Sequence, residues 1–161
     1  MQGRTPTGEA ATEVILSIFR ANGLLIARGD LLSASEGLTS ARWQVMGAIA
    51  LPERALTVPQ IARRMGLTRQ SVHATVKRLA ADGLVELAPN ADHRRSPLVR
   101  LTELGQRNYA ALDGRQATWV NRLARGIGRS DLETAGRVLD DLSTRLEAET
   151  DAESVRARSA A

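Results

Sequence analysis

The stretch from Leu56 to Gly105 constrains the fold most, because two short amphipathic helices, a tight turn and a hairpin follow one another there. Thr57 and Gln60 have the spacing of a capping box, which predicts that a helix begins at Thr57. Gly66 stands where this helix would end in a left-handed residue, and Thr68 can cap a second helix that Gly83 closes. This order is typical of a helix-turn-helix.

Two short β-prone runs follow, at residues 84–87 and 98–101. The segment between them, residues 89–96, is rich in turn-forming residues and contains Arg94 and Arg95. We therefore expect a β-hairpin with a basic tip, which is the wing of a winged helix-turn-helix. Such an arrangement offers one helix to a major groove and an arginine-bearing loop to the neighbouring backbone or minor groove of DNA.

The charge of the chain is concentrated in the same region. Between Arg54 and Arg100 there are nine basic and three acidic residues, a net charge of +6, whereas the whole chain carries +4. The remaining residues are therefore slightly acidic. A basic surface confined to one region would neutralise phosphates and release their counterions, so the charge distribution favours nucleic-acid binding independently of any motif.

Long amphipathic segments flank this region on both sides. Apolar residues recur every three or four positions from Ala11 to Ile26, in a helix expected to end near residues 35–37, and again from Leu132 to Leu146 after a cap at Ser130. A further helix is expected from Thr102 to about Gly126. Three long helices with apolar stripes would expose a large patch in a monomer, and such patches usually mark an association surface. We expect a mainly α-helical protein with a small β-hairpin wing, in which a winged helix-turn-helix head is joined to a helical dimerisation platform. The predicted parts are an N-terminal dimerisation helix (1–37), the DNA-binding domain (38–101), C-terminal dimerisation helices (102–150) and a disordered tail (151–161).

Other classes of protein find little support. The chain has no cysteine, which excludes disulfides and thiolate metal sites, and it has no phosphate-binding loop or Gly-x-Ser-x-Gly motif. Its two histidines, His73 and His93, both fall in the predicted DNA-facing region, so we expect neither an enzyme nor a dedicated metal or cofactor site. Charged residues interrupt the first helix, so we expect neither a signal peptide nor a membrane span, and a cytoplasmic location.

About 65 contiguous residues have a family-typical pattern, which extends from the helix with Trp43 and Val45 to the start of the helix after the wing. Its elements are Leu38-Thr39, Leu56-Thr57-Val58, Ile61-Ala62, Gly66 to Val72, Leu79, Gly83-Leu84-Val85, Arg94-Arg95 and Leu101-Thr102-Glu103-x-Gly105. In this pattern the chain resembles the MarR family of bacterial transcriptional regulators. The resemblance implies a homodimer in which the first, fifth and sixth helices intertwine while two winged heads bind a pseudopalindromic operator. It further implies a small effector, often aromatic or anionic, that binds between platform and head. We expect a repressor rather than an activator.

The candidate DNA-contacting residues lie on the second helix of the motif, at the N-terminal caps of both helices and in the wing. They are Thr57, Thr68, Arg69, Gln70, Ser71, His73, Ala74, Lys77, Arg78, Arg94 and Arg95. Arg95 would enter or flank a minor groove, and Arg94 would bind phosphates. The alternative for each is an ordinary solvated face, and Thr57 and Thr68 are caps first of all. The family often has arginine at position 74 and aspartate at position 93, where this chain has Ala74 and His93.

Four residues are candidates for an effector pocket, namely Phe19, Arg42, Trp43 and Met46. The alternative, that the bulky ones belong to the core, is favoured because such residues at helical spacing usually pack. Two other functions remain open from the sequence. One is an architectural protein that coats DNA with little sequence preference, and the other is a winged-helix module that binds another protein.

Overall fold

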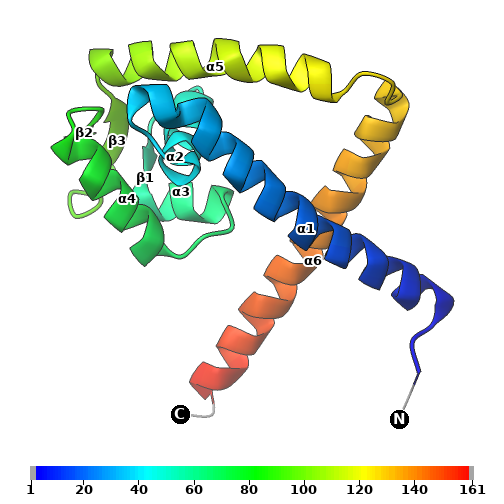
Figure 1. The fold of residues 1–161 in the computed structure, drawn as a ribbon. Helices are drawn as coiled ribbons and strands as arrows, with labels where there is room; N and C mark the ends of the chain where they lie inside the picture. The colour runs from blue at the N-terminus through cyan, green and yellow to red at the C-terminus, as the bar shows by residue number, and fades with distance from the viewer. Residues whose placement is uncertain (1–2, 160–161) are drawn as a thin grey trace. The chain divides into compact units, whose positions relative to one another are not determined.

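A computed structural model describes residues 3–159, and the chain divides into two compact units after Thr118. The described residues are mainly helical (Figure 1). The helices are α1 (Pro6–Ser33), the short 3-10 helix η1 (Ala34–Glu36), α2 (Ser40–Ala50), α3 (Val58–Arg64), α4 (Arg69–Ala81), α5 (Glu103–Leu123) and α6 (Arg129–Ser159). The strands are β1 (Leu56–Thr57), β2 (Val85–Ala88) and β3 (Leu98–Leu101). The predicted fold class is confirmed.

The strands form one small antiparallel sheet in the order β1–β3–β2. β3 lies in the middle, with Val99 opposite Leu56 on one side and Leu87 on the other. The hairpin of β2 and β3 was predicted, but β1 was not, because two residues are too few to show the alternation by which a strand is recognised. The sheet joins the start of α3 to the wing, so the helix-turn-helix and the hairpin form one body.

A continuous core holds the first unit together. Its largest fully buried side chains come from α2, α3, α4, β3 and α5 and include Met46, Ile61, Val72, Leu79, Val99 and Leu112. On α4 the apolar residues at helical spacing, namely Val72, Val76 and Leu79, are all buried. The helix-turn-helix and its wing therefore fold around their own core.

Thr102 and Gly105 join the end of the helix-turn-helix to the start of α5. The Thr102 hydroxyl donates a hydrogen bond to the Gly83 carbonyl oxygen (2.6 Å) and accepts one from the Gly105 amide (3.1 Å). A Cβ atom at Gly105 would collide with the backbone carbonyl of Leu84. The spacing Thr102-x-x-Gly105 thus has a physical reason, because the threonine caps α5 while the glycine permits close backbone approach.

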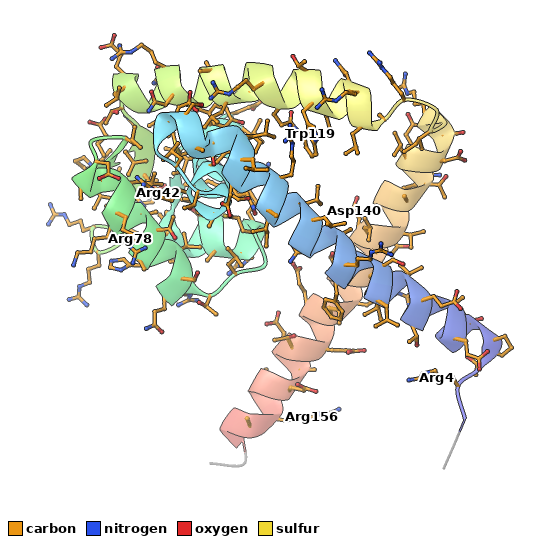
Figure 2. The ribbon with its side chains drawn as sticks, in the orientation of Figure 1. Arg4, Arg42, Arg78, Trp119, Asp140 and Arg156 are labelled. Carbon is orange, nitrogen blue, oxygen red and sulfur yellow. The ribbon has the colours of Figure 1, made fainter. Side chains whose placement is uncertain are left out.

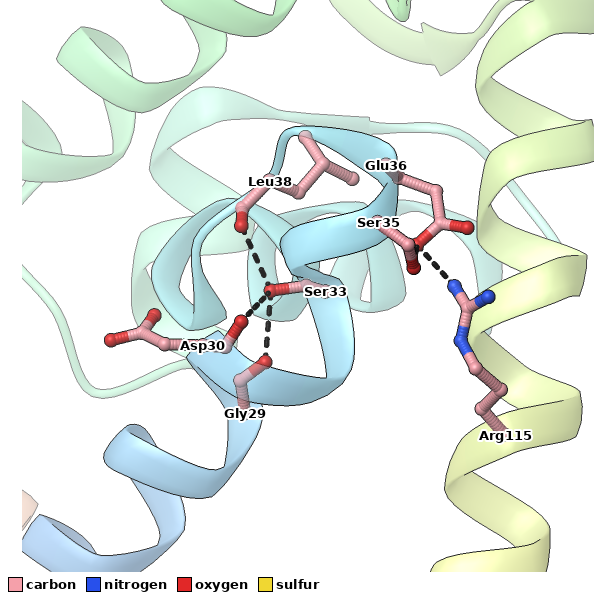
Figure 3. A network of polar contacts seen from close by, with 7 residues as sticks. All are labelled: Gly29, Asp30, Ser33, Ser35, Glu36, Leu38 and Arg115. Carbon is pink, nitrogen blue, oxygen red and sulfur yellow. Dashed lines mark hydrogen bonds and ion pairs between the residues drawn. The ribbon is translucent and has the colours of Figure 1, made fainter.

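A polar cluster fixes the junction between α1 and α2 (Figure 3). The Ser33 hydroxyl lies within hydrogen-bonding distance of the carbonyl oxygens of Gly29 (2.8 Å) and Leu38 (3.0 Å). Glu36 forms an ion pair with Arg115 of α5, and the hydrogen bond from Arg115 lowers the pKa of the Glu36 carboxyl group. The end of α1 is therefore tied both to α2 and to α5.

Apolar side chains outside this core remain exposed on the long helices. On α1 only Gly29 and Ser33 are buried, while its exposed apolar residues are Val14, Ile15, Leu16, Phe19, Leu24, Leu25, Ile26 and Leu31. In the second unit the exposed apolar residues include Val120, Leu123, Leu132, Val138, Leu139 and Leu146. By length and hydropathy alone, the segment Pro6–Glu36 is also apolar enough to cross a membrane. A single helix of this kind is weak evidence for a membrane span, because helices of soluble proteins also pass this test, so the expectation of no span is not overturned.

Two expectations about the C-terminal part are wrong. α6 begins at Arg129 rather than after a Ser130 cap, and the Gly128 carbonyl oxygen accepts the amides of Asp131 and Leu132. Residues 151–159, predicted as a disordered tail, continue α6. Polarity suggested disorder, but alanine, glutamate and arginine are strong helix formers and neither glycine nor proline interrupts the segment. Residues 160 and 161 lie outside the described part.

Candidate nucleic-acid interface

The exposed face of α4 carries polar and basic side chains. Because Val72, Val76 and Leu79 face the core, the opposite side of the helix is left to solvent. The predicted contact residues on this helix are all exposed there: Arg69, Gln70, Ser71, His73, Ala74, Lys77 and Arg78. Figure 2 shows basic side chains extending outward from this part of the first unit, with Arg78 labelled.

The start of α4 is capped by Thr68. Its hydroxyl accepts a hydrogen bond from the Ser71 amide (3.1 Å), and the threonine side chain is exposed. A helix N-terminus carries unpaired N–H groups and the positive end of the helix dipole, so it attracts anions such as phosphate. The cap and the predicted phosphate contact are compatible at this residue.

The wing places two arginines at its tip. Residues 89–97 connect β2 to β3, and Arg94 and Arg95 are both exposed. The Ser96 amide donates to the His93 carbonyl oxygen (2.9 Å), so the two arginines are the central residues of a tight turn. Nine residues of loop therefore present two guanidinium groups next to each other.

A groove of about 710 Å³ lies between α4 and the wing. Its apolar residues come from α3, α4, β2 and the wing loop and include Val58, Pro59, Val76, Leu87 and Pro97. Its polar and basic residues are Arg69, Gln70, His73, Lys77 and Arg95. The structure thus brings one wing arginine and the α4 side chains to a single concave surface, and this surface has the positive charge that the sequence predicts.

Thr57 does not belong to this surface. It is only 6% exposed. Its amide donates to the Gln60 Oε1 atom (2.8 Å), and its hydroxyl lies 3.0 Å from the same atom. The predicted capping box forms, but burial removes Thr57 from any contact with a ligand outside the fold.

The four effector candidates do not come together. Met46 is fully buried in the core, Trp43 is half-buried against it, and Phe19 is exposed on α1. Arg42 forms an ion pair with Asp82 at the end of α4 and donates to the Gly37 carbonyl oxygen (3.3 Å). These positions correct the prediction of a pocket lined by all four, because the apolar periodicity of a helix does not show which of its faces meets which neighbour.

Trp43 does line a separate hollow of about 550 Å³ between α2 and α5. Tyr109 and Asp113 of α5 lie on the same wall. Burial, and to a smaller extent the charge of Asp113, raises the pKa of the Tyr109 hydroxyl. The sequence analysis did not identify Tyr109, since a lone tyrosine on a long helix carries no motif.

No cluster of three or more histidine or acidic side chains able to hold a metal ion occurs among the residues that the structure describes. Asn90 and the Arg42–Asp82 ion pair are the polar features near the interface that sequence analysis missed. The ion pair joins residues 40 positions apart, so no local pattern could have indicated it.

Comparison with known proteins gives a consistent answer. Residues 36–96 match the model of the MarR family. An uncharacterised protein of Mycobacterium tuberculosis is 41% identical over 136 residues, which cover 84% of this chain and 94% of the relative. The transcriptional activatory protein BadR of Rhodopseudomonas palustris is 30% identical over 106 residues, covering 65% of this chain and 61% of BadR.

The fold is also that of solved regulators. The crystal structure of CouR from Rhodococcus jostii RHA1, bound to p-coumaroyl-CoA, superposes with a TM-score of 0.74 over 83% of this chain and 93% of CouR, at 20% sequence identity. The match of the central region, the relatives and the winged fold agree, and the chain belongs to the MarR family of transcriptional regulators.

Proposed function

We propose that the protein is a homodimeric, sequence-specific DNA-binding regulator that binds a pseudopalindromic operator. The observation that carries this proposal is the groove in which Arg95 of the wing and the exposed polar face of α4 meet. α4 would enter the major groove, and the wing would contact the flanking DNA.

The side chains of this surface suit different parts of DNA, namely base edges, phosphates and the minor groove. Gln70 and Ser71, on the first turn of α4, can hydrogen-bond base edges, where a good bidentate pairing contributes about 1–3 kcal/mol of discrimination. Lys77, Arg78 and Arg94 suit phosphates, which position the protein without reading sequence. Arg95 suits the narrow, electronegative minor groove of A/T-rich DNA.

The exposed apolar faces of α1 and of the second unit support a dimer. Large exposed apolar patches are uncommon on soluble monomers and usually mark an association surface. Most soluble homo-oligomers are two-fold symmetric, and a two-fold dimer presents its two heads to two half-sites about one helical turn apart. For the apolar face of α1 we favour a second copy of the chain over a membrane as the partner, because the chain matches the MarR family model and has the winged fold of solved regulators.

We further propose that the protein acts in the cytoplasm as a repressor whose DNA binding responds to a small aromatic or anionic molecule. A dimer that covers a promoter blocks transcription without any further contact, whereas activation requires one. The hollow lined by Trp43 and Tyr109 would accept a flat ring. CouR was crystallised with p-coumaroyl-CoA, an aromatic acyl ligand, while BadR is named as an activator.

Selection of preferred sequences from a random duplex pool tests the DNA-binding proposal. We expect an inverted repeat, bound at least about 10³-fold more tightly than random duplex at physiological salt. Equal affinity for all duplexes would instead support an architectural DNA-coating protein. Absence of binding at low salt, together with salt-insensitive binding to a protein partner, would support a protein-interaction module.

A further inference from the structure

Asn90 lies at the base of the wing loop, next to the end of β2, and is half-buried. We propose that Asn90 is a positioning residue, whose side chain fixes the turn that presents Arg94 and Arg95 to DNA. The inference rests on the proposed function, because it assigns a role to Asn90 through these two arginines.

The Asn90 side chain uses both ends of its amide group. Its Nδ2 atom donates to the Ser96 carbonyl oxygen (2.8 Å), which closes the loop just after the arginines. Its Oδ1 atom accepts the Asp92 amide (3.1 Å), which fixes the residues just before them. Together with the Ser96 amide bonded to His93, these contacts enclose Arg94 and Arg95 from both sides.

The neighbouring residues offer little else to order the loop. Pro97 has no amide to donate, Ala91 has no polar side chain, and both arginines are exposed. Without the two hydrogen bonds of Asn90, the nine-residue loop would sample more conformations. Its conformational entropy would then be lost on DNA binding, which would weaken the binding. The contribution of Asn90 is thus to order the arginines before DNA arrives.

Few side chains can replace asparagine here. The two contacts need a donor and an acceptor on one short side chain. Aspartate keeps the acceptor but loses the donor, and glutamine is one methylene longer. We therefore expect both Asn90→Ala and Asn90→Asp to loosen the turn.

The first experiment uses no DNA. Trypsin cleaves after arginine, so its rate of cleavage at Arg94 and Arg95 in the folded, full-length protein reports how well the turn is held. We expect Asn90→Ala to increase this rate at least about fivefold without lowering the midpoint of thermal unfolding. Asn121→Ala is the control, because Asn121 is an exposed asparagine of α5 that lies outside the candidate nucleic-acid interface. Cleavage of Asn90→Ala at the wild-type rate would overturn the inference.

The second experiment measures affinity for the selected operator across several salt concentrations. We expect Asn90→Ala to weaken binding about 5- to 10-fold, which corresponds to the cost of ordering roughly one residue of backbone. In the double variant Arg94→Ala/Arg95→Ala, adding Asn90→Ala should change affinity less than about twofold, because the groups it positions are gone.

The outcomes separate this inference from the proposed function. If Asn90→Ala weakens DNA binding of the Arg94→Ala/Arg95→Ala variant as much as that of the wild type, Asn90 contacts DNA itself or supports the fold, and the positioning role is wrong. If the Arg94→Ala/Arg95→Ala variant binds the operator as tightly as the wild type, the wing contact of the proposed function is wrong, and the inference is wrong with it. A wild-type chain that binds no duplex would overturn both.

Discussion

The head and the long helices use the same apolar residue types in opposite ways. In the head, Met46, Ile61, Val72 and Leu79 have no more than a trace of exposure and pack against one another. On α1, Phe19 is 69% exposed. No residue of α6 whose burial is described is buried. Hydrophobic burial is complete within the chain in the head, while the apolar faces of the long helices are exposed and would be buried in the proposed dimer.

Because of this difference, the stability of the head and that of the long helices should respond differently to protein concentration. A core that is complete within one chain is stable at any dilution, whereas an interface between two copies follows mass action. The charge distribution matches the division, because the region from Arg54 to Arg100 carries the excess positive charge. In the proposed function, the basic head would bind a polyanion and the long helices would bind an apolar surface.

The largest effect is expected from Phe19→Asp. The change removes a large apolar side chain from each copy of the proposed interface and places a charge there, so we expect the dimer dissociation constant to rise by at least about 100-fold. Sedimentation equilibrium at micromolar concentration measures it. Leu51→Asp is the matched control, because Leu51 is also 69% exposed but belongs to the head. If both variants remain dimers with wild-type affinity, the apolar face of α1 is not the interface.

Leu79→Ala in the core of the head should have the next largest effect. A fully buried leucine of α4 is truncated, and we expect the free energy of unfolding to fall by about 2–5 kcal/mol at any protein concentration. Urea denaturation at two protein concentrations measures this free energy. Leu24→Ala, at a site 64% exposed on α1, should instead show a loss that depends on concentration. If both variants lost the same free energy of unfolding, and both losses depended on protein concentration, the head and the long helices would not differ in how they are stabilised.

The head was largely predictable from sequence because its signals are local. The Thr68 cap, the left-handed Gly66 and the basic loop between two β-prone runs each depend on residues close together in the chain, and the structure confirms all three. The identity of the exposed α4 face followed from helical periodicity alone. Sequence reasoning therefore located most of the candidate interface.

The remaining features depend on which elements meet in space. The ion pair of Arg42 with Asp82 joins residues 40 positions apart, and the sequence suggested an effector role for Arg42 instead. Burial of Thr57 follows from the pairing of β1 with β3, and β1 is too short to be recognised in the sequence. Residues 151–159 are helical because propensity prevails over polarity.

Arg95→Ala should have an intermediate effect confined to DNA binding. Loss of one guanidinium from the groove beside α4 should weaken binding by about 1–3 kcal/mol and reduce the salt slope by about one per subunit. We expect similar weakening for the operator and for random duplex, measured by titration at several salt concentrations. Arg107→Ala is the control, because Arg107 is an exposed arginine that pairs with Glu103 on α5. Unchanged affinity and slope for Arg95→Ala would exclude the wing contact.

The smallest effect concerns pH at the junction where the head meets α1. The pKa of Glu36 is lowered in the folded protein by its hydrogen bond from Arg115, so the carboxylate stabilises the fold above the pKa that Glu36 has in the unfolded chain. This contribution is lost as the pH falls through the lowered value. We expect Glu36→Gln to be slightly less stable than the wild type at pH 7, and the difference to shrink under acidic conditions. Thermal unfolding from neutral to acidic pH measures it, with Glu103→Gln as the control for an exposed pair on α5. A difference that stays constant with pH would show that the ion pair does not stabilise the junction, and that the ties of Ser33 and Asp30 hold α1 against the head without it.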